Sequence, residues 1–291
     1  MPLIRMDELL VRAKKGKYAV AAFECWNSAN IYGIAAGAAE CGAPVIFQAS
    51  PVEYEIMGGP DVLRQIVELY VKKTGITAAL HLDHGATLAQ VEECADAGFT
   101  SVMLDASTLP FAGNLALSKA AAEIAHKHHI CIEAELGHVG GSNEGGIENG
   151  GGNVLTDPLE AVTFVRETGI DCLAVAIGTV HGDYRGEPHI DLERLRKIAK
   201  VVDIPLVLHG GSGTPPDILR RAIAIGIAKI NICTDIHKTW LEGIAAARAS
   251  LTPSVPGKFY RPSHALLTQK VEEIIKLFKN DFGMENENQP K

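Results

Sequence analysis

The stretch TAALHLDHGATLAQVEECADAGFTSVML, residues 77–104, decides the fold because it contains one strand–helix–strand unit. TAALHL (77–82) and TSVML (100–104) are near-continuous apolar runs, which are typical of strands in a parallel sheet covered on both faces. ATLAQVEECADAG (86–98), between them, has helical periodicity and ends at glycine. The first run ends in His81, Asp83 and His84. A buried strand has no use for three ionisable groups, so its end is solvated or opens into a site.

The same unit recurs along the chain of 291 residues. Apolar runs stand at 18–23, 44–49, 77–82, 100–104, 130–135, 171–177, 204–208 and 228–232. Helical patterns stand between them at 61–73, 86–98, 114–129, 157–169, 191–202 and 215–226. Eight such units predict an α/β fold, a single (β/α)8 TIM barrel over residues 1–291. A doubly wound open sheet is the alternative, but it gives no reason for eight strands.

Two further segments interrupt or extend this pattern. The glycine-rich stretch 140–153 is expected to be a mobile lid, and 237–280 a C-terminal helical extension.

Composition narrows the environment and the partners. The formal net charge of −8 argues against nucleic acid and acidic membrane surfaces as partners. Six cysteines without a CxxC pair are expected to be reduced thiols. The N-terminal residues lack the apolar segment of a signal peptide, and no run of 18 uncharged apolar residues occurs. These features predict a cytoplasmic protein.

Polar residues gather where the predicted strands end, which is where barrel enzymes place their active sites. His84, His181 and His209 follow the third, sixth and seventh strands. Three imidazoles with an open fourth position form a catalytic zinc arrangement. The alternative for each one is a structural histidine held by hydrogen bonds.

Two loops after the last strands favour a phosphate ligand. HGGSG (209–213) and NICTD (231–235) follow strands seven and eight, the common phosphate site of this fold. A tight turn that needs glycine is the alternative reading of the first loop. Zinc beside phosphate points to carbon–carbon bond chemistry or isomerisation of a ketose phosphate.

Six motifs extend this interpretation to a known family. They are HLDHG (81–85), SVMLDAS (101–107), IEAELGHVGG (132–141), LAVAIGTVHGDY (173–184), LVLHGGSG (206–213) and IAKINICTD (227–235). With these motifs the chain resembles the class II, zinc-dependent fructose-bisphosphate and tagatose-bisphosphate aldolase family, from about residue 5 to about residue 240.

The resemblance implies reversible cleavage of a ketose phosphate or bisphosphate to dihydroxyacetone phosphate and an aldehyde, through a metal-stabilised enediolate. It implies that His84, His181 and His209 hold Zn²⁺ and that Glu135 is a further metal partner. Asp83 would act as acid and base on the aldehyde-derived oxygen. The resemblance also implies a monovalent cation, Na⁺ or K⁺, near the phosphate and a homodimer or homotetramer. The substrate-binding residues would be Asn27, Ser50, Gly182, Gly210, Gly211, Ser212, Asn231, Ile232, Cys233 and Thr234.

The chain departs from the family pattern at three positions. Glu24 stands where relatives usually have Asn and adds negative charge near the metal. Asn143 stands where the lid usually carries an acid, and Glu144 is the candidate to replace that acid as the second catalytic residue. Ala112 also replaces a common acid. These changes favour a ketose phosphate other than fructose bisphosphate.

Two other functions stay open at this point. A metal-dependent sugar-phosphate epimerase or isomerase could use Asp83 and Glu144 as paired acids across the substrate. A non-catalytic aldolase-like subunit could have kept the fold and accumulated changes such as Glu24 and Asn143.

Overall fold

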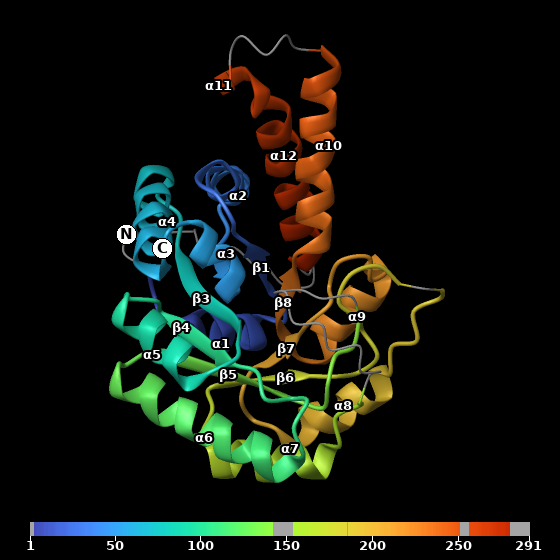
Figure 1. Cartoon of the computed structure of the whole chain (residues 1–291). Coiled ribbons are helices and arrows are strands. Elements are labelled where there is room, and N and C mark those ends of the chain that lie inside the picture. The colour runs from blue at the N-terminus through green and yellow to red at the C-terminus, as the bar shows by residue number, and fades with distance from the viewer. Residues whose placement is uncertain (1–2, 142–153, 185, 251–255, 280–291) are drawn as a thin grey trace, which may run out of the picture.

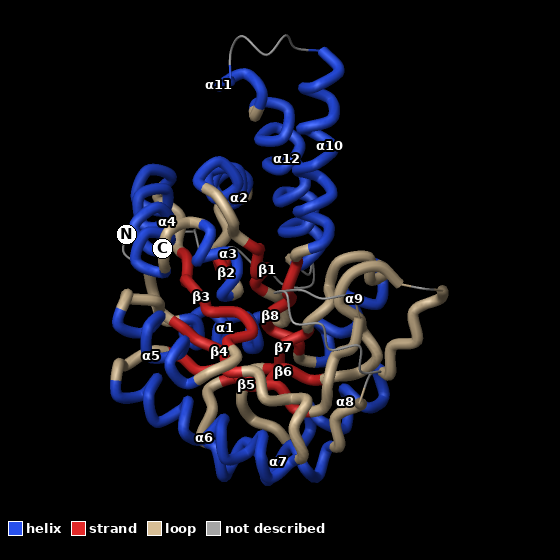
Figure 2. Tube along the Cα trace, in the orientation of Figure 1, coloured by secondary structure: helices blue, strands red, loops and turns tan. Residues whose placement is uncertain are grey.

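Eight parallel strands close into a barrel, as predicted. The computed structural model describes residues 3–141, 154–184, 186–250 and 256–279 (Figure 1). Each strand pairs with the next, and β8 pairs with β1 to close the sheet (Figure 2). The strands are β1 (Val20–Glu24), β2 (Val45–Ala49), β3 (Ala78–Gly85), β4 (Ser101–Leu104), β5 (Cys131–Leu136), β6 (Cys172–Val175), β7 (Leu206–Leu208) and β8 (Ile227–Ile232).

Helices alternate with the strands and surround the barrel (Figure 1). All six predicted helical segments are present, with ends shifted by a few residues. The helices are α1 (Met6–Gly16), α2 (Ser28–Glu40), α3 (Pro51–Ile56), α4 (Pro60–Thr74), α5 (Leu88–Asp96), α6 (Phe111–Lys127), α7 (Pro158–Thr168), α8 (Leu192–Val201), α9 (Pro216–Ile225), α10 (Thr234–Ser250), α11 (Pro256–Phe259) and α12 (Arg261–Phe278).

The interior of the barrel is apolar at one end and polar at the other. At the amino-terminal ends of the strands, inward side chains such as Val20, Ile46 and Val207 pack against Met6 and Leu10 of α1. Helix α1 therefore closes this end of the barrel. Ionisable side chains lie from the middle of the barrel to the carboxyl-terminal ends of the strands. These ends, together with the loops that follow them, we call the mouth.

The helices α10, α11 and α12, which we call the arm, extend beyond the barrel (Figure 1). Helix α12 packs against α10 and against α2. Its contact with α2 depends on two glycines, since a Cβ at Gly33 would lie 2.9 Å from Leu267 and one at Gly37 2.7 Å from the Thr268 carbonyl oxygen. None of the helices in the described ranges is long and apolar enough to cross a bilayer.

Candidate active site

The three predicted metal histidines come together in the mouth. His84 is the last residue but one of β3, His181 lies in the loop after β6, and His209 follows β7. Their ring centroids are 5.1 Å (His84–His181), 4.8 Å (His84–His209) and 5.7 Å (His181–His209) apart. One ring nitrogen of each lies within 4.8 Å of the others, so the three imidazoles can bind one ion. The predicted convergence of these histidines is confirmed.

In His84 and His209, a carboxylate determines which of the two ring nitrogens could bind a metal. His84 Nδ1 lies 2.8 Å from Asp105 Oδ2, and His209 Nε2 lies 2.9 Å from Glu133 Oε1. A carboxylate accepts, so each of these nitrogens is the donor, and in the neutral ring the opposite nitrogen carries the lone pair. The lone pairs of His84 Nε2 and His209 Nδ1 are thereby available to a metal.

Three buried atoms at the centre of the histidine cluster suit a zinc ion. His84 Nε2, His209 Nδ1 and Glu135 Oε2 are buried and have no hydrogen-bond partner within the described part of the chain. His209 Nδ1 and Glu135 Oε2 lie 3.0 Å apart without an aligned hydrogen bond. Buried polar atoms without partners are costly, and nitrogen and carboxylate oxygen are zinc donors. The donor set therefore suits a cation that all three atoms could share.

The three histidines differ in the direction in which their surroundings shift the pKa. Burial, with the neighbouring His84 and His209, holds the pKa of His181 well below its usual range. Burial would also lower the pKa of His209, but the neighbouring carboxylates of Glu133 and Glu135 outweigh it and raise the pKa to about 9. Burial would lower the pKa of His84 too, but the carboxylates of Asp83 and Asp105 outweigh it and raise the pKa well above its usual range.

A buried ion pair lies inside the barrel and reaches His209 through Glu133. Lys229 Nζ lies 2.8 Å from Glu133 Oε2, and both side chains are fully buried. Burial and the Lys229 charge lower the pKa of His81 to about 3. His81 is therefore neutral, and its 3.7 Å separation from Glu133 is not an ion pair. Its Nδ1 instead lies 2.8 Å from Ser101 Oγ.

Two side-chain amides hold the carboxylate of Asp83. Gln48 Nε2 donates to Asp83 Oδ2 at 2.7 Å, and Asn231 Nδ2 donates to Asp83 Oδ1 at 3.2 Å. Burial would raise the pKa of Asp83, but the charges of His84 and Lys229 outweigh it, and the pKa is lowered. Asp83 is thus an oriented, ionised carboxylate beside the histidine cluster.

The backbone at His84 explains how two consecutive residues serve one site. Successive side chains of a strand point to opposite faces, so Asp83 and His84 should diverge. His84 has φ +46°, and the pairing of β3 with β4 is irregular between Leu82 and Gly85. This irregularity breaks the alternation, which lets His84 join Asp83 at the mouth.

The glycine loop after β7 is both a tight turn and a candidate phosphate site. Gly210 has φ +67°, and a Cβ there would overlap the Val180 carbonyl oxygen. The Gly211 N–H donates to the Asn231 carbonyl oxygen at 3.1 Å, and Ser212 Oγ accepts from the Asp235 N–H at 3.1 Å. The alternative interpretation, a tight turn that needs glycine, therefore holds for Gly210, and the loop also lies against the first turn of α10.

The other predicted substrate residues also lie around the mouth, but they differ in which of their atoms a ligand could contact. Asn27 caps α2, and the Ser50 N–H donates to Glu24 Oε1 at 3.1 Å. The Ile232 side chain packs in the outer core, which leaves its backbone alone for a ligand. Gly182, Cys233 and Thr234 belong to the loops after β6 and β8 or to the start of α10.

The predicted lid falls mostly outside the described residues. Glu144 lies outside them, as does most of 140–153. The start of this stretch is described: Gly140 accepts a hydrogen bond from the His181 N–H at 2.9 Å, and Gly141 pairs with His181. The stretch therefore begins directly beside a candidate metal ligand.

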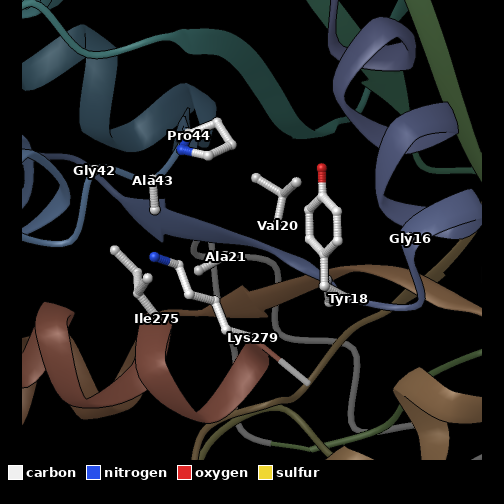
Figure 3. A pocket seen from close by; sticks show the side chains of 10 residues that line it. Gly16, Tyr18, Val20, Ala21, Gly42, Ala43, Pro44, Ile275 and Lys279 are labelled. Atoms are coloured by element: carbon white, nitrogen blue, oxygen red, sulfur yellow. The ribbon is translucent and has the colours of Figure 1, made fainter. Parts of the chain in front are cut away.

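An apolar pocket at the other end of the barrel is distinct from the candidate active site. It lies beside the start of β1 and β2 and the end of α12, and its volume is about 200 Å³ (Figure 3). Tyr18, Pro44 and Ile275 line it, and none of the predicted site residues does (Figure 3). The chemistry is thus expected at the mouth.

Comparison with known proteins agrees with this site. The family model for class-II fructose-bisphosphate aldolase matches residues 4–282. The chain belongs to the class II fructose-bisphosphate aldolase family. Class II aldolases depend on zinc in general, and the histidine cluster of this aldolase offers suitable ligands.

Relatives of this aldolase cover nearly its whole length. It is 39% identical over 284 residues to a 6-phospho-5-dehydro-2-deoxy-D-gluconate aldolase of Halalkalibacterium halodurans, with 97% of this chain and 96% of that protein covered. It is 42% identical over 237 residues to a fructose-bisphosphate aldolase of Geobacillus stearothermophilus, with 81% and 82% covered. The YdjI aldolase of Escherichia coli K12 has a similar structure, with a TM-score of 0.83, 29% identity, and 96% and 98% of the two chains covered.

Sequence reasoning missed three polar residues of this aldolase's site. It assigned no role to Glu133, Lys229 or Gln48, although each interrupts an apolar strand. A polar or charged residue inside an apolar run could have signalled them, since a fully buried polar group or charge normally has a partner.

Proposed function

We propose that this chain is a zinc-dependent aldolase that reversibly cleaves a ketose phosphate to dihydroxyacetone phosphate and an aldehyde. The observation that carries the proposal is the set of unpartnered buried donors on His84, His209 and Glu135. His84, His181 and His209 would hold the metal, with Glu135 in reach. Bound zinc would polarise the ketone carbonyl and stabilise the negative charge that cleavage leaves behind.

Asp83 is suited to the proton transfer that accompanies cleavage. As the carbon–carbon bond breaks, the hydroxyl that becomes the aldehyde oxygen loses its proton, and an ionised carboxylate can accept it. The amides of Gln48 and Asn231 keep Asp83 oriented for this step. The carbon left on the dihydroxyacetone phosphate half then takes up a proton, which we assign to Glu144.

The phosphate is assigned to the loops after β6, β7 and β8. Gly182, Gly210 to Ser212, and Asn231 to Thr234 surround this position, and the amino terminus of the 17-residue helix α10 adds a favourable dipole. A monovalent cation beside the phosphate is part of the proposal, and replacing K⁺ and Na⁺ by a bulky organic cation should lower activity.

Membership of the family does not determine which ketose phosphate is the substrate. Relatives of similar identity are named for fructose bisphosphate and for 6-phospho-5-dehydro-2-deoxy-D-gluconate.

Six free cysteines support the prediction of a reducing, cytoplasmic compartment.

The test is release of dihydroxyacetone phosphate from a panel of ketose phosphates. Zinc-loaded protein is coupled to a reductase for that product, with and without a chelator. We expect release from at least one sugar, its loss with the chelator, and its loss in His181→Ala. His189→Ala, an exposed histidine outside the cluster, is the control and should retain activity. Stoichiometric zinc without release from any sugar would contradict the proposal.

A further inference from the structure

His181 differs from the other two candidate metal ligands in how its ring is held. His84 donates to the carboxylate of Asp105, and His209 donates to that of Glu133. The ring of His181 has no hydrogen-bond partner among the residues that the structure describes. A metal ligand without such a partner depends for its orientation on the loop that carries it. The position of this loop therefore matters more for His181 than for the other two.

Two glycines enclose the backbone at His181 and just before it. A Cβ at Gly210 would overlap the Val180 carbonyl oxygen, and one at Gly141 would overlap the carbonyl oxygen of His181 itself. Only a residue without a side chain permits such a close approach. The His181 N–H also donates to the Gly140 carbonyl oxygen at 2.9 Å. These contacts hold the loop up to His181, and the residues after it need a contact of their own.

Tyr184 supplies that contact. Its hydroxyl oxygen lies 2.7 Å from Thr214 Oγ1, and Thr214 Oγ1 donates to the Gly210 carbonyl oxygen at 3.0 Å. A hydroxyl group has one proton, so Thr214 uses its proton on Gly210, and Tyr184 is the donor to Thr214. Thr214 is 5% exposed, and Tyr184 is partly buried. Two hydrogen bonds thus connect the loop of His181 to the residue that follows His209.

A second link of the same loop is weaker. Asp183, next to Tyr184, forms an ion pair with Lys238 of α10. The two side chains are 72% and 51% exposed. Exposed ion pairs contribute little to stability, because water and salt screen them. Of these two links, the one through Tyr184 is therefore the stronger.

From these contacts we infer that Tyr184 is a positioning residue for the metal site: its hydroxyl, through Thr214, holds the loop of His181 against the loop of His209. The inference rests on the proposed function in that His181 is taken as a zinc ligand. The Tyr184 hydroxyl is engaged by Thr214, so its loss should lower the affinity for zinc without removing a ligand. Zinc-saturated protein should then keep its turnover.

The test is the affinity of Tyr184→Phe for Zn²⁺, measured on zinc-free protein by competition against a chromogenic chelator. This variant should bind Zn²⁺ about tenfold more weakly than the wild type, the lower end of the range for groups that orient a metal ligand. Its activity should fall at limiting zinc, and its kcat should return to the wild-type value at saturating zinc. Tyr18→Phe is the control, because Tyr18 lines the pocket at the other end of the barrel, and it should behave as the wild type.

Substitutions of Thr214 test the same link from its other end. Thr214→Val removes the hydroxyl and should lower the zinc affinity as much as Tyr184→Phe does. A protein with both changes should bind zinc about as well as Thr214→Val alone, because the two changes break one chain of hydrogen bonds. Thr214→Ser keeps the hydroxyl and should retain the wild-type affinity.

The outcomes separate the inference from the proposed function. Wild-type zinc affinity in Tyr184→Phe, with a loss in His181→Ala, overturns the inference and leaves the proposed function standing. Unchanged affinity in His181→Ala overturns the proposed metal site itself. A kcat that stays low in zinc-saturated Tyr184→Phe overturns the positioning role, because the hydroxyl would then act in the reaction. If Tyr184→Phe does not fold, the comparison of Thr214→Val with Thr214→Ser decides the question.

Discussion

Asp105 determines how His84 can bind a metal. Its carboxylate accepts from His84 Nδ1 at 2.8 Å and leaves Nε2 as the free donor. Burial would raise the pKa of Asp105, but hydrogen bonds from His84 and Ser107 outweigh it and lower the pKa, so the carboxylate stays charged. A ligand held in this way is oriented before the metal arrives.

Asp105→Asn should therefore weaken zinc binding by about 10- to 100-fold, because the ring loses its charged acceptor. The measurement is competition for Zn²⁺ against a chromogenic chelator. Asp96→Asn is the matched control, since Asp96 also lies near a histidine, His128, but has an exposed side chain and no contact with the cluster among those the structure describes. Equal zinc affinity for the two variants would contradict the orienting role of Asp105.

The sequence predicted site residues at or near the carboxyl ends of the strands and missed the two charged ones nearer the middle of a strand. His84, His181 and His209 follow apolar runs, so the barrel rule places them at the mouth. Lys229 and Glu133 lie within such runs, and both faces of a parallel barrel strand are buried. Sequence alone does not show which of the two faces a residue occupies, and the pairing of these two charges depends on contacts between β5 and β8.

At the scale of elements, apolar strands were predictable and the glycine-rich helix α2 was not. Its sequence SANIYGIAAGAAE has no polar face, because the helix is buried against the barrel and against α12. Amphipathic periodicity, the usual signal, is absent from a helix covered on both sides. The glycines that weaken the helical pattern are those that allow α12 to approach.

Gly37→Ala should destabilise the protein by about 1–3 kcal/mol through overpacking. The new Cβ would lie 2.7 Å from a backbone oxygen of α12 and 2.8 Å from Val271, although alanine is the better helix former. Gly113→Ala in α6 is the control, because its Cβ would lie 3.5 Å from Leu109, an ordinary contact. That change should be neutral or stabilising by up to about 1 kcal/mol. Urea unfolding measures both, and equal effects would contradict the close α2–α12 packing.

At the scale of the whole molecule, the buried charges predict how stability depends on pH. His81 has a pKa of about 3 when folded, against about 6.5 when unfolded. The unfolded chain therefore binds a proton that the folded chain does not, and stability falls as pH drops below about 6.5. Glu133 acts in the same direction below about pH 4.3, because Lys229 and His209 outweigh its burial and lower its pKa.

The free energy of unfolding should thus decrease from pH 6.5 to 5 and more steeply from pH 5 to 4. The measurement is urea unfolding of zinc-free protein, with a chelator present so that metal release does not contribute. Retained stability at pH 4 would show that the folded barrel does not keep His81 neutral and Glu133 ionised.

The arm bears on the oligomeric state, which stays a prediction. It extends beyond the barrel and carries exposed apolar side chains, with Leu241 63%, Tyr260 49% and Leu266 38% exposed. Apolar surface on a projecting element is typical of a protein–protein contact. A second copy of the chain is the partner that the expected homodimer or homotetramer would provide.

Leu241→Glu should therefore shift the protein toward monomers, because the arm contact would have to bury a charge. Light scattering after size exclusion measures the mass, which should be two or four times that of one chain for the wild type. Leu159→Glu is the control, since Leu159 is 77% exposed on α7, on the barrel and away from the arm. A wild-type monomer would contradict the predicted assembly, and an oligomer unaffected by Leu241→Glu would place the contact elsewhere. If Leu241→Glu gives folded monomers with wild-type kcat, each barrel completes its own active site.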